Sequence, residues 1–221
     1  MMGTHRSDAV GVACLAFVAL LAQQAGASPV KVIVTSASGA PVQDTVIVFD
    51  PLDAKPPATN ATASIDQINK RFVPRVNVVR TGTQITFPNS DRIRHQVYSF
   101  SKAKQFTLKL YAGSPKTAVL FDQPGLVVLG CNIHDQMVGY IYVTDAGYYG
   151  KSDAQGTLHL SNLPAGDYTL TWWSPYIADA PEKMTETVHV AEHEPVSVQV
   201  QLSRDLRARP EPGARQTDWS Y

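Results

Sequence analysis

Two stretches of the sequence decide its fold, Phe87-Pro-Asn-Ser-Asp-Arg-Ile-Arg-His95 and Leu129-Gly-Cys-Asn-Ile-His-Asp-Gln-Met137. Together they hold two imidazoles, one thiol and one thioether. Cys131, His134 and Met137 fall within seven residues, so these three side chains must come from one compact loop between two strands. His95 lies 36 residues before Cys131 and must come from a neighbouring strand, which a β-sandwich allows.

This set of side chains suits copper. A trigonal plane of two His and one Cys, with a long axial Met, serves both the soft Cu(I) and the harder Cu(II) state. Because neither state then requires a new geometry, little has to move when an electron arrives or leaves. The sequence therefore predicts a mononuclear copper site with four candidate ligands: His95, Cys131, His134 and Met137.

Two other readings of the same residues are weaker. Zinc also binds Cys and His, but its sites normally take a fourth Cys, His or carboxylate ligand. Asp135 is adjacent to His134 and is hard to direct at the same ion. A Cys-His nucleophile is disfavoured because Cys131 and His134 share one short loop with no third group to orient them. We therefore expect no enzymatic activity.

The rest of the sequence is typical of an all-β fold. Short runs rich in apolar and β-branched residues alternate with turns that contain Gly or Pro, and no window of about twelve residues keeps a helical apolar period without them. We expect a Pro-rich linker at 51–62 and a disordered tail at 203–221, where Arg and Pro accumulate. The runs expected to form strands are 30–34, 45–49, 72–73, 76–79, 84–87, 95–100, 106–110, 117–121, 127–129, 138–143, 158–160, 168–173 and 196–202.

Residues 1–27 have the features of a secretory signal peptide. Arg6 precedes an apolar run over residues 9–22, and the segment ends on Ala25-Gly-Ala27. The run is shorter than the roughly 20 residues of a membrane span, and no later run reaches that length. We expect a mature chain that starts near Ser28, has no membrane span and is located in the periplasm or an equivalent exported space.

Composition narrows the classes of partner. The sequence has 19 basic and 19 acidic residues and two cysteines. This neutral balance gives no support to nucleic-acid binding, which requires a clustered positive face. Because Cys14 lies in the predicted signal peptide, Cys131 is the only cysteine of the expected mature chain. A lone cysteine in an exported protein is a free thiol, an intermolecular partner or a metal ligand, and a bound metal would protect it.

The Cys131-x-x-His134-x-x-Met137 loop, together with Phe87-Pro-Asn-Ser-Asp91 and His95-Gln-Val-Tyr-Ser-Phe100, resembles the cupredoxin (blue copper) family. The likeness covers residues 63–145 and is to amicyanin-like cupredoxins of the methylamine-utilisation type. It implies a Greek-key β-sandwich and type 1 copper, with His95, Cys131 and His134 equatorial, Met137 axial, and His134 the more exposed ligand where electrons enter. One departure is Gln96, since many cupredoxins have an Asn there that ties the two ligand loops together.

Segments on both sides of the copper stretch resemble a second module. Residues 36–49 and 144–168 are similar to carboxypeptidase-regulatory-like (transthyretin-like) sandwich domains. In one arrangement the cupredoxin segment is inserted in such a sandwich, which opens with residues 28–50 and continues over 146–202. In the other, residues 30–50 add strands to the cupredoxin.

These features predict an exported, monomeric type 1 copper protein that carries single electrons between a redox protein donor and a redox protein acceptor. Copper storage, delivery or sensing is one alternative, and an adhesion or carbohydrate-binding β-sandwich with an accessory metal site is another. A link to amine oxidation rests on the resemblance alone.

Basic residues close to His95 in sequence form either a rim for an acidic redox partner or ordinary solvated strand faces: Arg92, Arg94, Lys102 and Lys104. The remaining histidines of the C-terminal part lack a Cys or Met at ligand spacing, and we expect ordinary packing or surface roles for them: His159, His189 and His193.

Overall fold

The computed structural model describes residues 26–53, 61–115, 117–176 and 184–202. Within these ranges the chain forms strands β1 to β17 and no helix, which confirms the predicted all-β class. No segment of this described part is a helix long and apolar enough to cross a membrane. Most of the predicted signal peptide, residues 54–60 of the predicted linker and the whole predicted tail lie outside the described residues.

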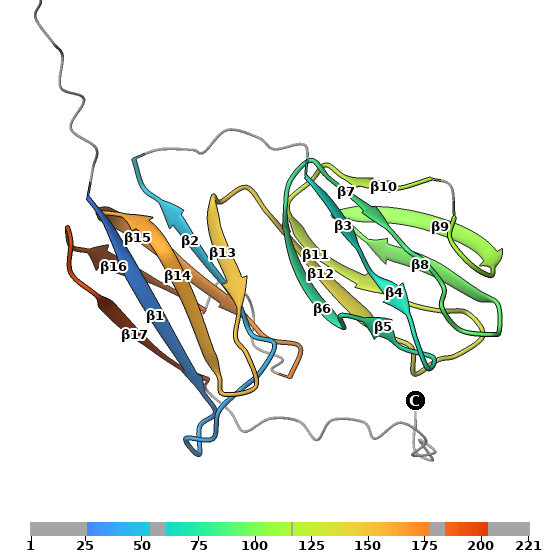
Figure 1. Ribbon diagram of the computed structural model, residues 1–221, viewed down its shortest axis with the longest axis horizontal. Helices are drawn as coiled ribbons and strands as arrows, with labels where there is room; N and C mark the ends of the chain where they lie inside the picture. Colours follow the sequence, from blue (N-terminus) through green and yellow to red (C-terminus); the bar gives the residue numbers. More distant parts are fainter. Residues whose placement is uncertain (1–25, 54–60, 116, 177–183, 203–221) are drawn as a thin grey trace, which may run out of the picture.

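Strands from both ends of the described chain form one β-sandwich, which we call the flanking sandwich (Figure 1). Strand β1 pairs with β14 and β17, and β2 pairs with β13 and β15, so the residues before and after the predicted copper-binding segment share both sheets. The first sheet has the order β14-β1-β17 and the second the order β13-β2-β15-β16. The strands are β1 (Ala27–Thr35), β2 (Val46–Pro51), β13 (Tyr148–Lys151), β14 (Thr157–Pro164), β15 (Gly166–Trp173), β16 (Thr185–Val190) and β17 (Val196–Gln201).

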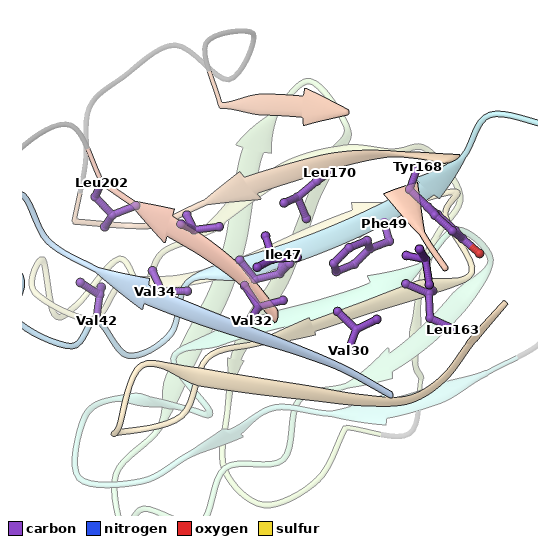
Figure 2. Close-up of a cluster of buried hydrophobic side chains, with 13 residues drawn as sticks. Val30, Val32, Val34, Val42, Ile47, Phe49, Leu163, Tyr168, Leu170 and Leu202 are labelled. Atoms are coloured by element: carbon purple, nitrogen blue, oxygen red, sulfur yellow. The ribbon is translucent and has the colours of Figure 1, made fainter. Parts of the chain in front are cut away.

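Alternating apolar residues fill the space between these two sheets. Side chains in a strand point alternately to opposite faces, and Val30, Val32 and Val34 of β1 are accordingly buried while Lys31 between them is exposed. They pack with Ile47 and Phe49 of β2 in the cluster drawn in Figure 2. This core belongs to the flanking sandwich alone.

The intervening residues form the central unit, strands β3 to β12. Sheet β11-β12-β6 and hairpin β8-β9 are joined by the backbone bridge between Tyr98 and Gly130, and a second core lies between them and sheet β10-β7-β3. This core contains Phe87, Phe121 and Leu129, all fully buried. The strands are β3 (Thr62–Ser64), β4 (Asp66–Gln67), β5 (Phe72–Val73), β6 (Val76–Arg80), β7 (Thr83–Thr86), β8 (His95–Ser101), β9 (Lys104–Tyr111), β10 (Val119–Phe121), β11 (Gly125–Leu129) and β12 (Gly139–Thr144).

Strand β2 is buried on both faces and connects the two parts. Ile47 and Phe49 belong to the core of the flanking sandwich, whereas Val46 and Val48 join a third cluster with Val76 of β6 and Trp173 of β15. A strand covered on both sides is a continuous apolar run, which explains Val46-Ile-Val-Phe49. The central unit therefore packs its sheet β11-β12-β6 against the outer face of β2 and β15, as the neighbouring positions in Figure 1 illustrate.

Candidate metal centre

His95 is the first residue of β8, and its side chain is fully buried. The pairing of β8 with β9 shifts register between His95 and Val97, so Gln96 lies at a β-bulge. Bulges change the local direction of a strand and are common beside functional sites. Strand β8 is connected to the loop after β11 at Tyr98, two residues after Gln96. There Tyr98 and Gly130 exchange two backbone hydrogen bonds of 3.0 and 2.9 Å.

Strand β11 leads directly into the loop that carries the other candidate ligands. Cys131 follows Gly130 and is buried. Two backbone hydrogen bonds shape the loop: the His134 N–H donates to the Cys131 carbonyl (3.3 Å), and the Met137 N–H donates to the His134 carbonyl (2.9 Å). These successive turns direct the side chain of His134 back toward Cys131, as the short loop predicted.

The structure brings three of the four predicted ligands together. The Sγ atom of Cys131 lies 3.7 Å from Nδ1 of His95 and 4.0 Å from Nδ1 of His134. One candidate ligand atom from each of the three residues lies within 4.8 Å of those of the other two. The two imidazole rings have centroids 5.0 Å apart and planes inclined by 56°.

These distances fit a metal ion bound by all three residues. Bonds of about 2.3 Å to sulfur and about 2.0 Å to nitrogen place sulfur and nitrogen roughly 3.7 Å apart when the angle at the metal is about 120°. One observed distance equals this value and the other exceeds it by only a few tenths of an ångström. The donor set, one thiolate and two imidazoles, is the trigonal set that suits copper.

His134 differs from His95 in its exposure. It is half-buried, whereas the neighbouring loop residue Ile133 is exposed. Burial first, and then the nearby His95, lower the pKa of His134. A lower pKa keeps the imidazole neutral near pH 7, which is the form that binds a metal.

Met137, the fourth predicted ligand, ends the loop. Its side chain is fully buried and belongs to the same apolar cluster as Cys131. A thioether at this place is compatible with a long axial bond to copper. It is equally able to fill a gap in the core, so its role as a ligand stays a prediction.

A carboxylate that the sequence did not single out contacts the site. The Oδ2 atom of Asp91 lies 2.7 Å from Nε2 of His95, on the side of the ring away from Cys131. Burial raises the pKa of Asp91, but hydrogen bonds from the backbone of Lys70, from His95 and from the backbone of Asn69 lower it by more. The signal that could have identified Asp91 is a carboxylate four residues before a ligand histidine.

The other predicted side chains lie apart from this group. Arg92 and Arg94 are exposed beside His95, but Lys102 and Lys104 are at the opposite end of the β8-β9 hairpin, where Lys104 pairs with Asp122 at 3.0 Å. The four basic residues therefore do not form one rim. The remaining histidines have separate surroundings: His159 is exposed on β14, His189 pairs with Asp167 at 2.7 Å, and the His193 ring lies against Gly26.

The chain is similar to solved structures of copper proteins. No protein-family model and no curated protein matches the chain. A Cu-containing nitrite reductase (NirK) from Thermus scotoductus SA-01 is 22% identical with a TM-score of 0.36, over 43% of this chain and 25% of that chain. A purple cupredoxin from Nitrosopumilus maritimus is 21% identical with a TM-score of 0.33, over 38% of this chain and 99% of that chain.

The Cu(I) form of an amicyanin mutant is 19% identical with a TM-score of 0.34, over 44% of this chain and 98% of that chain. The chain thus spans only a quarter of the nitrite reductase. Because these three TM-scores lie below 0.5, we base the assignment of the site on the geometry of its own residues.

Proposed function

We propose that the central unit is a cupredoxin that holds one type 1 copper ion and that the protein carries single electrons between redox proteins. The proposed ligands are His95, Cys131 and His134 in the plane and Met137 on the axis. The observation that supports this most directly is the pair of distances from Cys131 Sγ to the two Nδ1 atoms, 3.7 and 4.0 Å, in a largely buried site.

Copper would supply the one-electron Cu(I)/Cu(II) couple, and the chain supplies a rigid site around it. His95 and Cys131 are held by β8 and β11, which are joined by the hydrogen bonds between Tyr98 and Gly130. Fully buried apolar residues, among them Phe87 and Leu129, lie in the same cluster as Cys131 and exclude water from its inner side. A site held on strands in a packed core has little freedom to change its geometry between two charge states.

His134 is the residue through which we propose that electrons pass. It is the most exposed of the four proposed ligands, and the exposed Ile133 precedes it in the same loop. The spacing of Cys131, His134 and Met137 favours an amicyanin-like site within the cupredoxins.

Export, a monomeric state and the absence of catalytic activity belong to the same proposal. Cys131 is the free cysteine of the described residues and is buried, and a bound metal would protect its thiol in an oxidising space. Electron transfer between partners requires no substrate pocket at the site. Intact mass of the secreted protein and its mass in solution test export and oligomeric state.

Reconstitution with copper tests the assignment. The copper-loaded full chain should show the intense visible absorption of thiolate-to-copper charge transfer and a reversible one-electron voltammogram. Replacing Cys131 by Ser should abolish the colour, whereas His159→Gln, at an exposed histidine outside the group, should leave it unchanged. Persistence of the band in Cys131→Ser would contradict the assignment. Tight binding of Cu(I) with no blue oxidised state would instead indicate copper storage or delivery.

A further inference from the structure

Asp91 lies between the buried ligand His95 and an exposed turn of the central unit. The turn connects β4 to β5 and is closed by two backbone hydrogen bonds between Ile68 and Arg71, 3.0 and 3.1 Å long. Its two middle residues, Asn69 and Lys70, have φ angles of 53° and 59°. Positive φ at both positions is the geometry of a tight two-residue hairpin turn, and it is uncommon for a lysine.

The backbone of this turn is directed at the Asp91 carboxylate. The Asn69 N–H donates to Oδ1 at 2.6 Å, and the Lys70 N–H donates to Oδ2 at 2.8 Å. Oδ2 also faces Nε2 of His95 at 2.7 Å. Hydrogen bonds to an ionised acceptor are shorter and about twice as strong as neutral ones, so one carboxylate fixes both the turn and the imidazole.

This contact has a consequence for the protonation of His95. A neutral imidazole has one nitrogen that donates and one that accepts. A carboxylate with two N–H donors already on it can only accept from His95, which places the imidazole proton on Nε2. The lone pair of Nδ1 then faces Cys131 Sγ, 3.7 Å away.

We propose that Asp91 is a positioning residue of the metal centre, which locks His95 in the Nε2–H tautomer and whose negative charge favours the oxidised state of the site. The second half of this inference rests on the proposed copper function, and the first half does not. Carboxylate partners of ligand histidines generally fix the tautomer and raise the basicity of the ring. Here the same carboxylate also anchors the 68–71 turn to the ligand.

The first test needs no copper. Nitrogen-15 NMR of His95 in the metal-free full chain should give an Nε2–H imidazole in the wild type. Asp91→Asn should lose or mix this tautomer, because its amide cannot accept from the turn and from His95 in the same way. The matched control is Asp66→Asn, a carboxylate that binds Ser90 at 2.7 Å through Oδ2 and should leave the His95 signals in place. A wild-type His95 protonated on Nδ1 would refute the proposal whatever metal binds.

The second test uses the copper-loaded protein. The oxidised site carries one more positive charge than the reduced site, so removing a nearby negative charge favours Cu(I). Asp91→Asn should shift the Cu(II)/Cu(I) equilibrium toward Cu(I) by about tenfold, or about 59 mV for one electron, while Asp91→Glu should recover most of the shift. Asp66→Asn should shift it less than Asp91→Asn does. Equal shifts in the two Asn variants would show a general charge effect and overturn the positioning role.

If Asp91→Asn does not fold, Lys70→Gly tests whether the carboxylate or the lysine side chain orients His95. Glycine retains the backbone N–H and adopts positive φ without strain, so the tautomer of His95 should stay as in the wild type, whereas loss of the lysine charge, which acts on His134, should shift the equilibrium toward Cu(II). A lost tautomer in Lys70→Gly would show that the lysine side chain, rather than the carboxylate, orients the ring. A protein that shows the Nε2–H tautomer but binds no copper would refute the proposed function and leave the tautomer assignment standing.

Discussion

The phenol ring of Tyr98 lies against the α-carbon of Gly130, and the two residues exchange both of their backbone hydrogen bonds. An added Cβ at position 130 would be 2.6 Å from Cζ of that ring and 2.7 Å from its hydroxyl oxygen. Gly130 immediately precedes Cys131, so the absence of a side chain allows β8 to approach the start of the ligand loop. The glycine is therefore required by close contact between two strands.

Gly130→Ala should destabilise the central unit and disturb the proposed metal centre. The added methyl group would displace the Tyr98 ring. This ring already contacts Phe100, with ring centroids 5.1 Å apart, and that contact would be disturbed as well. Overpacking of this kind costs typically 1–3 kcal/mol, measurable by urea unfolding. A second change, Tyr98→Leu, should recover part of the loss, because contacting residues do not act additively. Strict additivity of the two changes would mean that the ring is not the obstacle.

Trp173→Ala should weaken the contact between the central unit and the flanking sandwich. The indole of Trp173 packs with Tyr140 and Tyr142 of β12 at centroid distances of 5.3 and 6.3 Å. Truncating a buried Trp costs typically 3–5 kcal/mol of unfolding free energy. When unfolding is followed by separate probes in the central unit and in the flanking sandwich, the two transitions should no longer coincide. The control is Val128→Ala, at an exposed position of strand β11, which pairs with β12. Its free energy of unfolding should stay within about 0.5 kcal/mol of the wild-type value.

Trp172 and Trp173 illustrate how far the sequence determines the fold. Adjacent residues on a strand face opposite sides, and Trp172 packs on the core of the flanking sandwich while Trp173 enters the cluster against β12. Strand periodicity predicts that one of them faces a core. It does not predict that a second part of the protein covers the other, because that depends on contacts distant in sequence.

Two strands show where local patterns fail. β16 (Thr185–Val190) is mostly exposed and has few apolar residues, and β4 (Asp66–Gln67) is only two residues long. Neither gives the alternation from which a strand is predicted. At the candidate metal centre, the spacing of the residues in the sequence predicted the group of His95, Cys131 and His134 that the structure brings together. Asp91 was not predicted because, apart from His95, its carboxylate binds backbone N–H groups. Every residue except proline has such a group, so the residue types in the sequence do not indicate this contact.

Tyr168 should make the flanking sandwich sensitive to alkaline pH. Its hydroxyl donates to the Pro164 carbonyl at 2.8 Å, and burial raises its pKa from 10.0 to about 12. A raised pKa in the folded state means that the contribution to stability is complete below pH 10 and is lost as the pH rises toward 12. Tyr168→Phe should cost about 1 kcal/mol at neutral pH and reduce the loss of stability above pH 10. Unchanged alkaline behaviour in this variant, measured by urea unfolding at several pH values, would assign the effect to other groups.

The start of β1 leads to a prediction about processing. The Gly26 carbonyl accepts the Ala165 N–H at 3.1 Å, and Ala27 pairs with Pro164 at the end of the β1-β14 ladder. Ser28 is fully buried, and its hydroxyl donates to the Ala191 carbonyl at 2.6 Å. Cleavage after Ala27 would remove these pairs and leave a terminal ammonium group on a buried residue, which is costly.

We therefore predict that an exported form keeps Gly26 and Ala27, two residues more than the Ala25-Gly-Ala27 motif alone suggests. A chain that begins at Ser28 should be less stable than a chain that begins at Gly26 by roughly 1–3 kcal/mol, the cost of an unsatisfied buried group. Urea unfolding of the two chains measures this difference, and intact mass of the secreted protein identifies the natural terminus. A natural terminus at Ser28 with no loss of stability would show that the first strand does not need these two residues.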